Sequence, residues 1–394
     1  MDPYANEWLD LLVRWLHVIA AVAWIGASFY FIALDNHLRP PKDEEDVDGG
    51  VGGEAWEIHG GGFYQVQKYR IAPVKLPEQL YWFKWEAYTT WLSGFALLIV
   101  LYYVNADTYL IDKDVADLSP WEAIAISIAL LAAAWVVYDA LCRLVPDDLV
   151  LAAVLLGLVT LSAWGISHLF SGRAEYIQVG AMLGTMMAGN VFLVIIPAHR
   201  ELIRAKEAGR EPDPAPGIRA KQRSVHNNYL TLPVVFTMIS NHFPITYGHS
   251  YSWLILVALL VIGAWVRHFF NLRHTGRTAW WIPVTAALGI AALAVAIRPQ
   301  DSGGESGGAP VSFARAQTIV DRRCVACHSL HPTKASSPPK GITFDEPAEI
   351  KARADAIERV AVDTKTMPLG NVTEMTQAER DELGAWIEQG AKIK

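Results

Sequence analysis

Eight long apolar segments constrain this chain more than any other feature of its sequence. A helix that crosses a bilayer needs about 20 mainly apolar residues. The candidate segments are 8–34, 86–104, 121–143, 149–170, 176–198, 228–247, 251–270 and 279–297. The sixth is the weakest, because Pro233, Asn241, His242 and Pro244 interrupt it, and such backbone is tolerated in a membrane only where protein or a cavity satisfies it. The pattern predicts an all-α fold that begins with a polytopic bundle of eight transmembrane helices.

Composition agrees with a membrane protein. Only 19% of the residues are charged, against roughly 25% in soluble domains, so an ordinary soluble enzyme is excluded. The net charge of -7 argues against nucleic acid as a partner. The first apolar segment lacks a basic leading region and a small-residue cleavage site, so we expect a retained helix and not a signal peptide.

The loops between the segments differ in charge on the two sides. Alternate loops carry 16 Lys and Arg residues on one side and 2 on the other. Basic loops stay in the cytoplasm, so the N-terminus is predicted to lie outside. With eight spans the C-terminus lies outside too. We therefore divide the chain into a transmembrane domain over 1–298, a flexible linker over 299–310 and a soluble tail over 311–394.

The tail carries the most specific motif, which is Cys324-Val325-Ala326-Cys327-His328. A C-x-x-C-H unit is the signature for covalent attachment of c-type haem. Two thiols bond to the porphyrin, and the adjacent His328 reaches the iron from the same turn. A redox dithiol or half of a zinc site would not require the histidine. The motif predicts haem c in the tail.

A c-type haem domain also needs a second axial ligand. Met367 lies 39 residues after His328 in the segment TKTMPLGN, which is typical of a loop. A methionine opposite a histidine is a known haem pairing that raises the potential. Met375 is the competing ligand, but it lies where a helix is expected to begin, with Thr376 as N-cap and Glu379 completing a capping box. The preferred iron ligands are therefore His328 and Met367. The tail resembles class I cytochrome c domains, which are all-α.

Polar residues inside the apolar segments are candidates for function. His17 lies too deep in the first segment to reach the membrane surface, and His242 is similarly placed. Each is either a packed neutral imidazole or an axial ligand of a non-covalent haem b. Asp139 and Arg143 are four residues apart on one helix, so an ion pair between them is the simple alternative to a functional role.

Three tracts resemble the membrane-bound, cytochrome-c-linked urate hydroxylase family. They are HNNYLTLPVVFTMISNHFP over 226–244, KLPEQLYWFKWEAYTTWLSGFALL over 75–98, and the tail segment TKTMPLGNVTEMT. The first apolar segment also resembles the His-bearing first helix of the oxygen-independent protoporphyrinogen oxidase family. The urate hydroxylase resemblance implies an enzyme of purine catabolism in the bacterial inner membrane, with both termini periplasmic. Such an enzyme hydroxylates urate with water to 5-hydroxyisourate and passes the electrons to its own haem c.

Urate is an anion at neutral pH, so its pocket needs a cation or amide donors, and proton removal needs a general base, most often histidine. By residue type, the candidate catalytic residues are Arg143, His226 and His242. The expected partners are urate, the lipid bilayer and an external cytochrome or terminal oxidase as electron acceptor. Two alternatives stay open. One is a quinol- or porphyrinogen-oxidising membrane redox protein, and the other is a non-enzymatic electron-carrier subunit.

Overall fold

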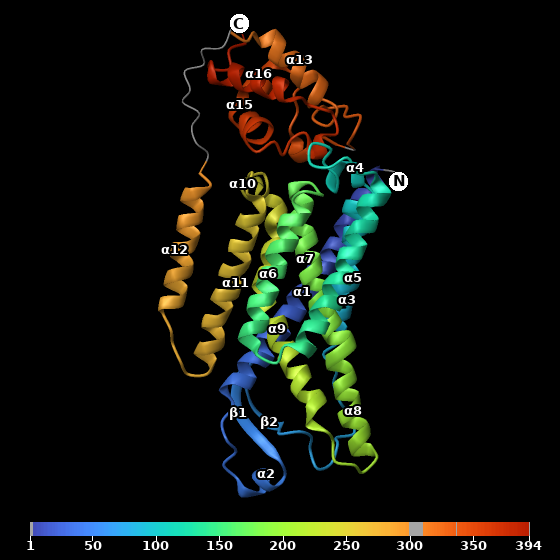
Figure 1. Ribbon diagram of the computed structural model, residues 1–394, viewed down its shortest axis with the longest axis vertical. Helices are drawn as coiled ribbons and strands as arrows, with labels where there is room; N and C mark the ends of the chain where they lie inside the picture. Colours follow the sequence, from blue (N-terminus) through green and yellow to red (C-terminus); the bar gives the residue numbers. More distant parts are fainter. Residues whose placement is uncertain (1–2, 299–309, 336, 394) are drawn as a thin grey trace.

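The computed structural model describes residues 3–298, 310–335 and 337–393. Its long axis runs through a bundle of helices, with a small hairpin at one end and a separate group of short helices at the other (Figure 1). The predicted linker over 299–310 lies, apart from Pro310, outside the described residues.

Each of the eight predicted apolar segments is helical. The bundle consists of α1 Pro3–His37, α3 Trp85–Leu97 with π-helix η1 Leu98–Tyr103, α4 Ala106–Tyr109, α5 Pro120–Leu144, α6 Asp148–Ile166, α7 Gly172–Gly189 with π-helix η2 Asn190–Ile195, α8 Ile196–Glu207, α9 Pro214–Ile239, the 3-10 turn η3 Ser240–His242, α10 Pro244–Tyr247, α11 Ser252–His274 and α12 Trp281–Ala296. The sixth segment breaks into η3 and α10, where the prolines and polar residues fall.

Within the described residues, five helices are long and apolar enough to cross a membrane. They are Tyr4–His37, Pro120–Leu144, Asp148–Ile166, Gly172–Glu207 and Ser252–His274. α12 is apolar but shorter, and α9 is more polar. α1 packs along α3, and α9 packs between α7 and α11, so all these helices form one bundle (Figure 1). A membrane-spanning bundle is thus supported, while eight crossings remain a prediction.

The segment between the first two apolar helices contains a β-hairpin. The short helix α2 Glu44–Asp48 precedes β1 Val51–His59, which pairs antiparallel with β2 Gly62–Tyr69. The hairpin lies at the end of the bundle opposite the tail (Figure 1). Glu57 of β1 accepts a hydrogen bond from Tyr30 at 3.0 Å and approaches His37 Nε2 at 3.2 Å. The hairpin is therefore fixed to the C-terminal end of α1. The sequence analysis expected no strand here.

The tail folds into a small helical unit. It contains α13 Phe313–Arg323, η4 Pro339–Gly341, α14 Pro347–Ala352, α15 Ala354–Ile357, η5 Glu358–Asp363, η6 Leu369–Asn371 and α16 Gln377–Glu388. The predicted capping box is present, since Thr376 accepts from the Glu379 N–H and Glu379 accepts from Thr376. Trp386 is 1% exposed in the tail core, as its apolar helix face predicts. The all-α prediction holds for the tail.

Candidate functional site

The C-x-x-C-H unit forms one compact turn at the end of α13. The Cys324 N–H donates to the Val320 carbonyl, and the N–H groups of Cys327 and His328 donate to the Cys324 carbonyl at 3.1 and 2.9 Å. Both cysteines are free thiols. Burial raises the pKa of Cys324 to about 12 and moves the pKa of Cys327 above its ordinary value, so both are neutral at pH 7. The turn presents two thiols and an imidazole together.

The imidazole of His328 is oriented by the backbone. Its Nδ1 lies 3.1 Å from the carbonyl oxygen of Ile342, and the ring packs against Phe344 with centroids 5.3 Å apart. When Nδ1–H donates to a carbonyl, Nε2 keeps its lone pair for a metal. The donor set and its orientation fit an axial ligand of a covalently attached haem.

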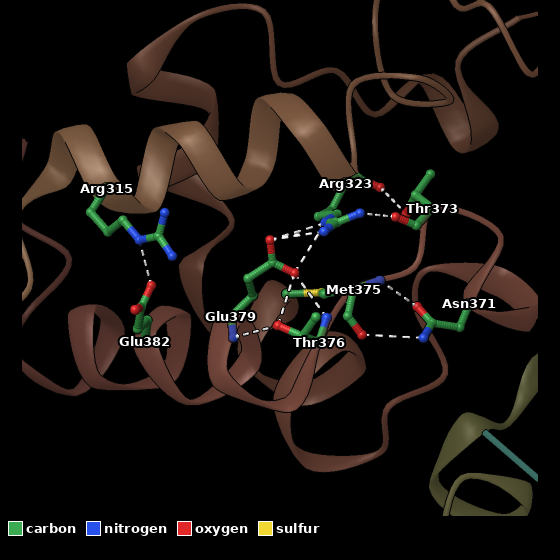
Figure 2. Close-up of polar contacts among 8 residues, drawn as sticks. All are labelled: Arg315, Arg323, Asn371, Thr373, Met375, Thr376, Glu379 and Glu382. Carbon is green, nitrogen blue, oxygen red and sulfur yellow. Dashed lines mark hydrogen bonds and ion pairs between the residues drawn. The ribbon is translucent and has the colours of Figure 1, made fainter.

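The two candidate methionines have different surroundings. Met375 is 2% exposed and belongs to the apolar core of the tail, beside Leu383 and Trp386. Figure 2 shows its side chain beside Glu379. The Asn371 side chain accepts a hydrogen bond from the Met375 N–H and donates one to the Met375 carbonyl. Core packing already accounts for Met375.

Met367 is half-buried and lies in a loop, as the sequence predicts. Its N–H donates to the Val360 carbonyl at 2.8 Å, and its carbonyl accepts from Arg380 at 2.7 Å. The backbone is therefore fixed while the thioether belongs to no apolar core cluster of the described residues. The Met367 side chain is therefore available for a further contact, while that of Met375 is packed in the core.

A cavity of about 330 Å³ lies inside the bundle between α1, α3, α7 and α9, and His17 forms part of its wall. The Nδ1 atom of His17 is 3.1 Å from both the Thr90 carbonyl and the Ser93 hydroxyl. These contacts leave Nε2 free, as for His328.

Small residues leave room in this cavity. A Cβ on Gly94 would lie 2.9 Å from the His17 Cε1 atom. Gly180 and Gly184 of α7 also line the space. His242, from η3, lines the same cavity and is exposed. The structure thus brings His17 and His242 to one largely apolar space.

Arg143 and His226 do not line this cavity and lie in a different part of the bundle. Arg143 is 68% exposed, and its guanidinium pairs with Asp139 at 2.8 Å, which is the ion pair that their spacing predicts. His226 is half-buried, and its Nδ1 lies 2.9 Å from the Tyr138 hydroxyl. The three candidate catalytic residues therefore do not converge, because His242 lies elsewhere.

Two buried residues that the sequence analysis missed, Arg223 and Asn190, join the polar side chains of this region. Arg223 is 3% exposed and pairs with Asp139 at 2.8 Å. Its Nη1 atom also donates to Asn190 at 3.3 Å, and Asn190 donates to Tyr138 and Asn227. Sequence reasoning had assigned Arg223 to a loop. A π-helix begins at Asn190, and such irregular turns often mark functional sites, but nothing in the sequence alone predicts one.

The tail contacts the bundle loops at one end of the bundle. Asn371 donates to Asp114 at 2.9 Å. Gly370 lies so close that a Cβ would be 2.7 Å from the Thr108 carbonyl oxygen and 2.9 Å from those of Asp107 and Ile111. A Cβ on Gly248 would likewise meet Thr364 at 2.6 Å and Thr366 at 2.7 Å. The loop that carries Met367 is therefore part of the contact.

The charges at this contact are complementary. Burial lowers the pKa of Arg380, and the nearby carboxylates of Asp114 and Asp112 oppose that shift. Burial raises the pKa of Asp112. A chamber of about 970 Å³ lies beside the contact, between the tail and the outer ends of the bundle helices.

The bundle contains long apolar helices, a buried polar network and an internal cavity lined by histidines. These features define a helical protein of the membrane type. Residues 3–298 match the family described as urate oxidase N-terminal. The match covers most of the chain, so the chain belongs to this family, and a urate-related oxidoreductase function follows. Comparison with curated proteins returns no significant match, and neither does comparison with solved structures.

Proposed function

We propose that the chain is a urate hydroxylase that passes electrons to its own tail. The reaction converts urate and water to 5-hydroxyisourate, two electrons and two protons. The observation that carries the proposal is the direct contact between the Met367 loop and a bundle of the urate oxidase N-terminal family. A tail fixed to the outer end of that bundle is well placed to receive the electrons.

Four residues of the tail would hold haem c. Cys324 and Cys327 supply the thioether bonds, and His328 and Met367 supply the axial ligands. The backbone contacts of His328 and Met367 support these roles, because they fix each residue without using its ligating atom. Bound there, haem c would accept electrons one at a time. These residues and the tail over 311–394 then form a cytochrome c domain.

His17 would hold a haem b in the bundle, with His242 as the candidate for the opposite side. The cavity, the free Nε2 of His17 and the glycines around it support this placement. A haem b in this cavity would relay electrons between an inward-opening substrate site and the tail.

His226 is one of the proposed catalytic residues, and the contact of its Nδ1 with the Tyr138 hydroxyl at 2.9 Å supports it by orienting the ring. Arg143 and His242 are the other proposed catalytic residues. Arg143 is exposed and would draw the urate anion toward the protein without binding it in the site, while His242 lies on the cavity wall.

We further propose a bacterial inner-membrane location with periplasmic termini. The charge of the loops supports it, because the basic loops and the hairpin lie opposite the tail (Figure 1). An external cytochrome or a terminal oxidase would then take electrons from the tail outside the cytoplasm.

The test uses oxidised membranes that contain the full chain. Added urate should produce the absorption band of reduced c-type haem, and added quinol should not. Reduction by quinol alone would instead support the quinol-oxidising alternative. A c-type haem that dithionite reduces but urate does not would reject the proposal.

A further inference from the structure

Two buried arginines lie at or against α9, and only one of them is paired with a carboxylate. Arg223 belongs to α9, and Arg267 of α11 contacts it. Arg223 pairs with the Asp139 carboxylate and with Asn190. Arg267 of α11 is also 3% exposed, but its Nε donates at 2.8 Å to the neutral side chain of Asn228. Within the described residues, Arg267 has no carboxylate partner, and its Nη2 atom has no hydrogen-bond partner at all.

An isolated buried charge is costly unless it is paired. Arg267 gains a contact with the Phe29 ring, whose centroid is 3.9 Å from its guanidinium carbon. A cation–π contact and one neutral acceptor replace only part of the lost hydration. The Nη2 donor of Arg267, which has no partner within the described residues, is therefore evidence for an anion that binds in the bundle.

Two further polar atoms on the same face of α11 lack partners. They are Asn271 Oδ1 and His274 Nδ1, both buried. Residues 267, 271 and 274 follow the spacing that places side chains on one side of a helix. α1 packs against this helix, and Asn36 of α1 donates to the Asn271 carbonyl at 3.4 Å. Buried polar atoms without partners call for a ligand or ordered water.

We propose that Arg267, Asn271 and His274 form the binding site for the urate anion. Arg267 donates to an oxygen of the anion, Asn271 Oδ1 accepts an N–H of the purine, and His274 supplies a second ring-nitrogen contact. This inference rests on the proposed function, because it names the substrate site of that reaction.

The site connects to the cavity that contains His17. Asn228, which accepts from Arg267, has a backbone carbonyl that accepts from Thr231 at 2.6 Å. Thr231 lines the cavity. Arg267 is therefore joined to the cavity lining through Asn228 and Thr231. A porphyrin propionate is the other anion that could reach Arg267.

Equilibrium binding of labelled urate to the purified full chain tests the site. The protein is kept reduced with dithionite so that no turnover occurs. Arg267→Gln should weaken urate binding at least tenfold, and Arg267→Lys, which keeps the charge, should weaken it less. Asn271→Asp, which adds a like charge, should also weaken it. Arg273→Gln on the exposed side of α11 is the matched control and should bind as the unchanged protein does.

Unchanged urate affinity in Arg267→Gln, with folding verified by haem c content, would overturn the inference. Absence of urate binding to the unsubstituted protein would also overturn it. Loss of b-type haem with unchanged urate affinity would assign Arg267 to a propionate instead. If urate binds through Arg267 but never reduces the haem in the oxidised protein, the proposed function fails while the binding site stands.

Discussion

Asn371 joins the tail to the bundle while it holds the tail's own loop. Its Nδ2 atom donates to Asp114 of the bundle at 2.9 Å and to the Met375 carbonyl at 3.1 Å. Its Oδ1 atom accepts from the Met375 N–H at 2.8 Å (Figure 2). One amide thus couples the position of the tail to the shape of the segment between Met367 and α16.

Substitution of Gly370 should separate the tail from the bundle. In Gly370→Ala the new methyl group would meet three carbonyl oxygens of the outer loop. Small misplacements of reacting groups can slow a reaction about 100-fold, so we expect urate-driven haem c reduction to slow by at least tenfold. Stopped-flow absorption measures this rate.

Gly341→Ala is the control for that experiment. Gly341 also has a positive φ, at 66°, against 56° for Gly370, but nothing lies within 4 Å of its Cβ position. Both variants share the cost of a left-handed backbone at alanine, about 1–2 kcal/mol, and only one disturbs the contact. Equal slowing in both variants would mean that the docking contact does not control the rate.

The two methionines should respond differently to truncation. Met367→Ala should lower the haem potential and leave the tail folded, because Met367 lies outside the core. Met375→Ala should destabilise the tail by about 2–5 kcal/mol through a core cavity, with less effect on potential. Redox titration and thermal unfolding measure these quantities. An unchanged potential in Met367→Ala would make Met375 or another residue the ligand.

Gly94→Ala should disturb the proposed haem b site. The added methyl would press on the His17 ring and move its free nitrogen. We expect b-type haem content to fall by at least half, as measured by a pyridine haemochrome spectrum. Gly26→Ala on α1, with nothing within 4 Å, should retain it. If the unsubstituted protein shows only c-type haem, no haem b occupies this cavity.

The Arg323–Glu379 pair should make tail stability depend on pH. Burial opposes ionisation of Glu379, but the Thr376 backbone hydrogen bond and Arg323 outweigh it and lower the pKa of Glu379 below its ordinary 4.5. The stabilisation is therefore present above pH 4.5 and is lost as pH falls through the lower, folded-state pKa. Hydrogen exchange of tail peptides measures this loss.

Glu379→Gln should make tail protection less dependent on pH in that acid range. Glu382→Gln is the matched control, because its pair with Arg315 is exposed (Figure 2), and such surface pairs contribute little to stability. A pH profile that is unchanged in Glu379→Gln would contradict the assignment.

Local patterns predicted much of this structure. Three features depend on residues close together in sequence, so the sequence alone predicts them. They are the apolar segments, the capping box at Thr376 and the turn at Cys324. The hairpin at Val51–Tyr69 was missed because its strands lie in a glycine-rich stretch that the sequence analysis assigned to a loop.

The polar sites of the bundle depend on contacts between distant residues. Arg223 meets Asp139, and Arg267 meets Asn228, across different helices. Sequence alone placed Arg223 among the loop charges, and it gave no reason to single out Arg267. Burial without a charged partner is visible only after the helices are packed.

The contact at Gly370 also determines how the reaction scales with dilution. A tail held against its own bundle meets its electron donor without diffusion, so the transfer step is first order in protein. Turnover per molecule should therefore stay constant when the membranes are diluted, until delivery to the external acceptor becomes limiting.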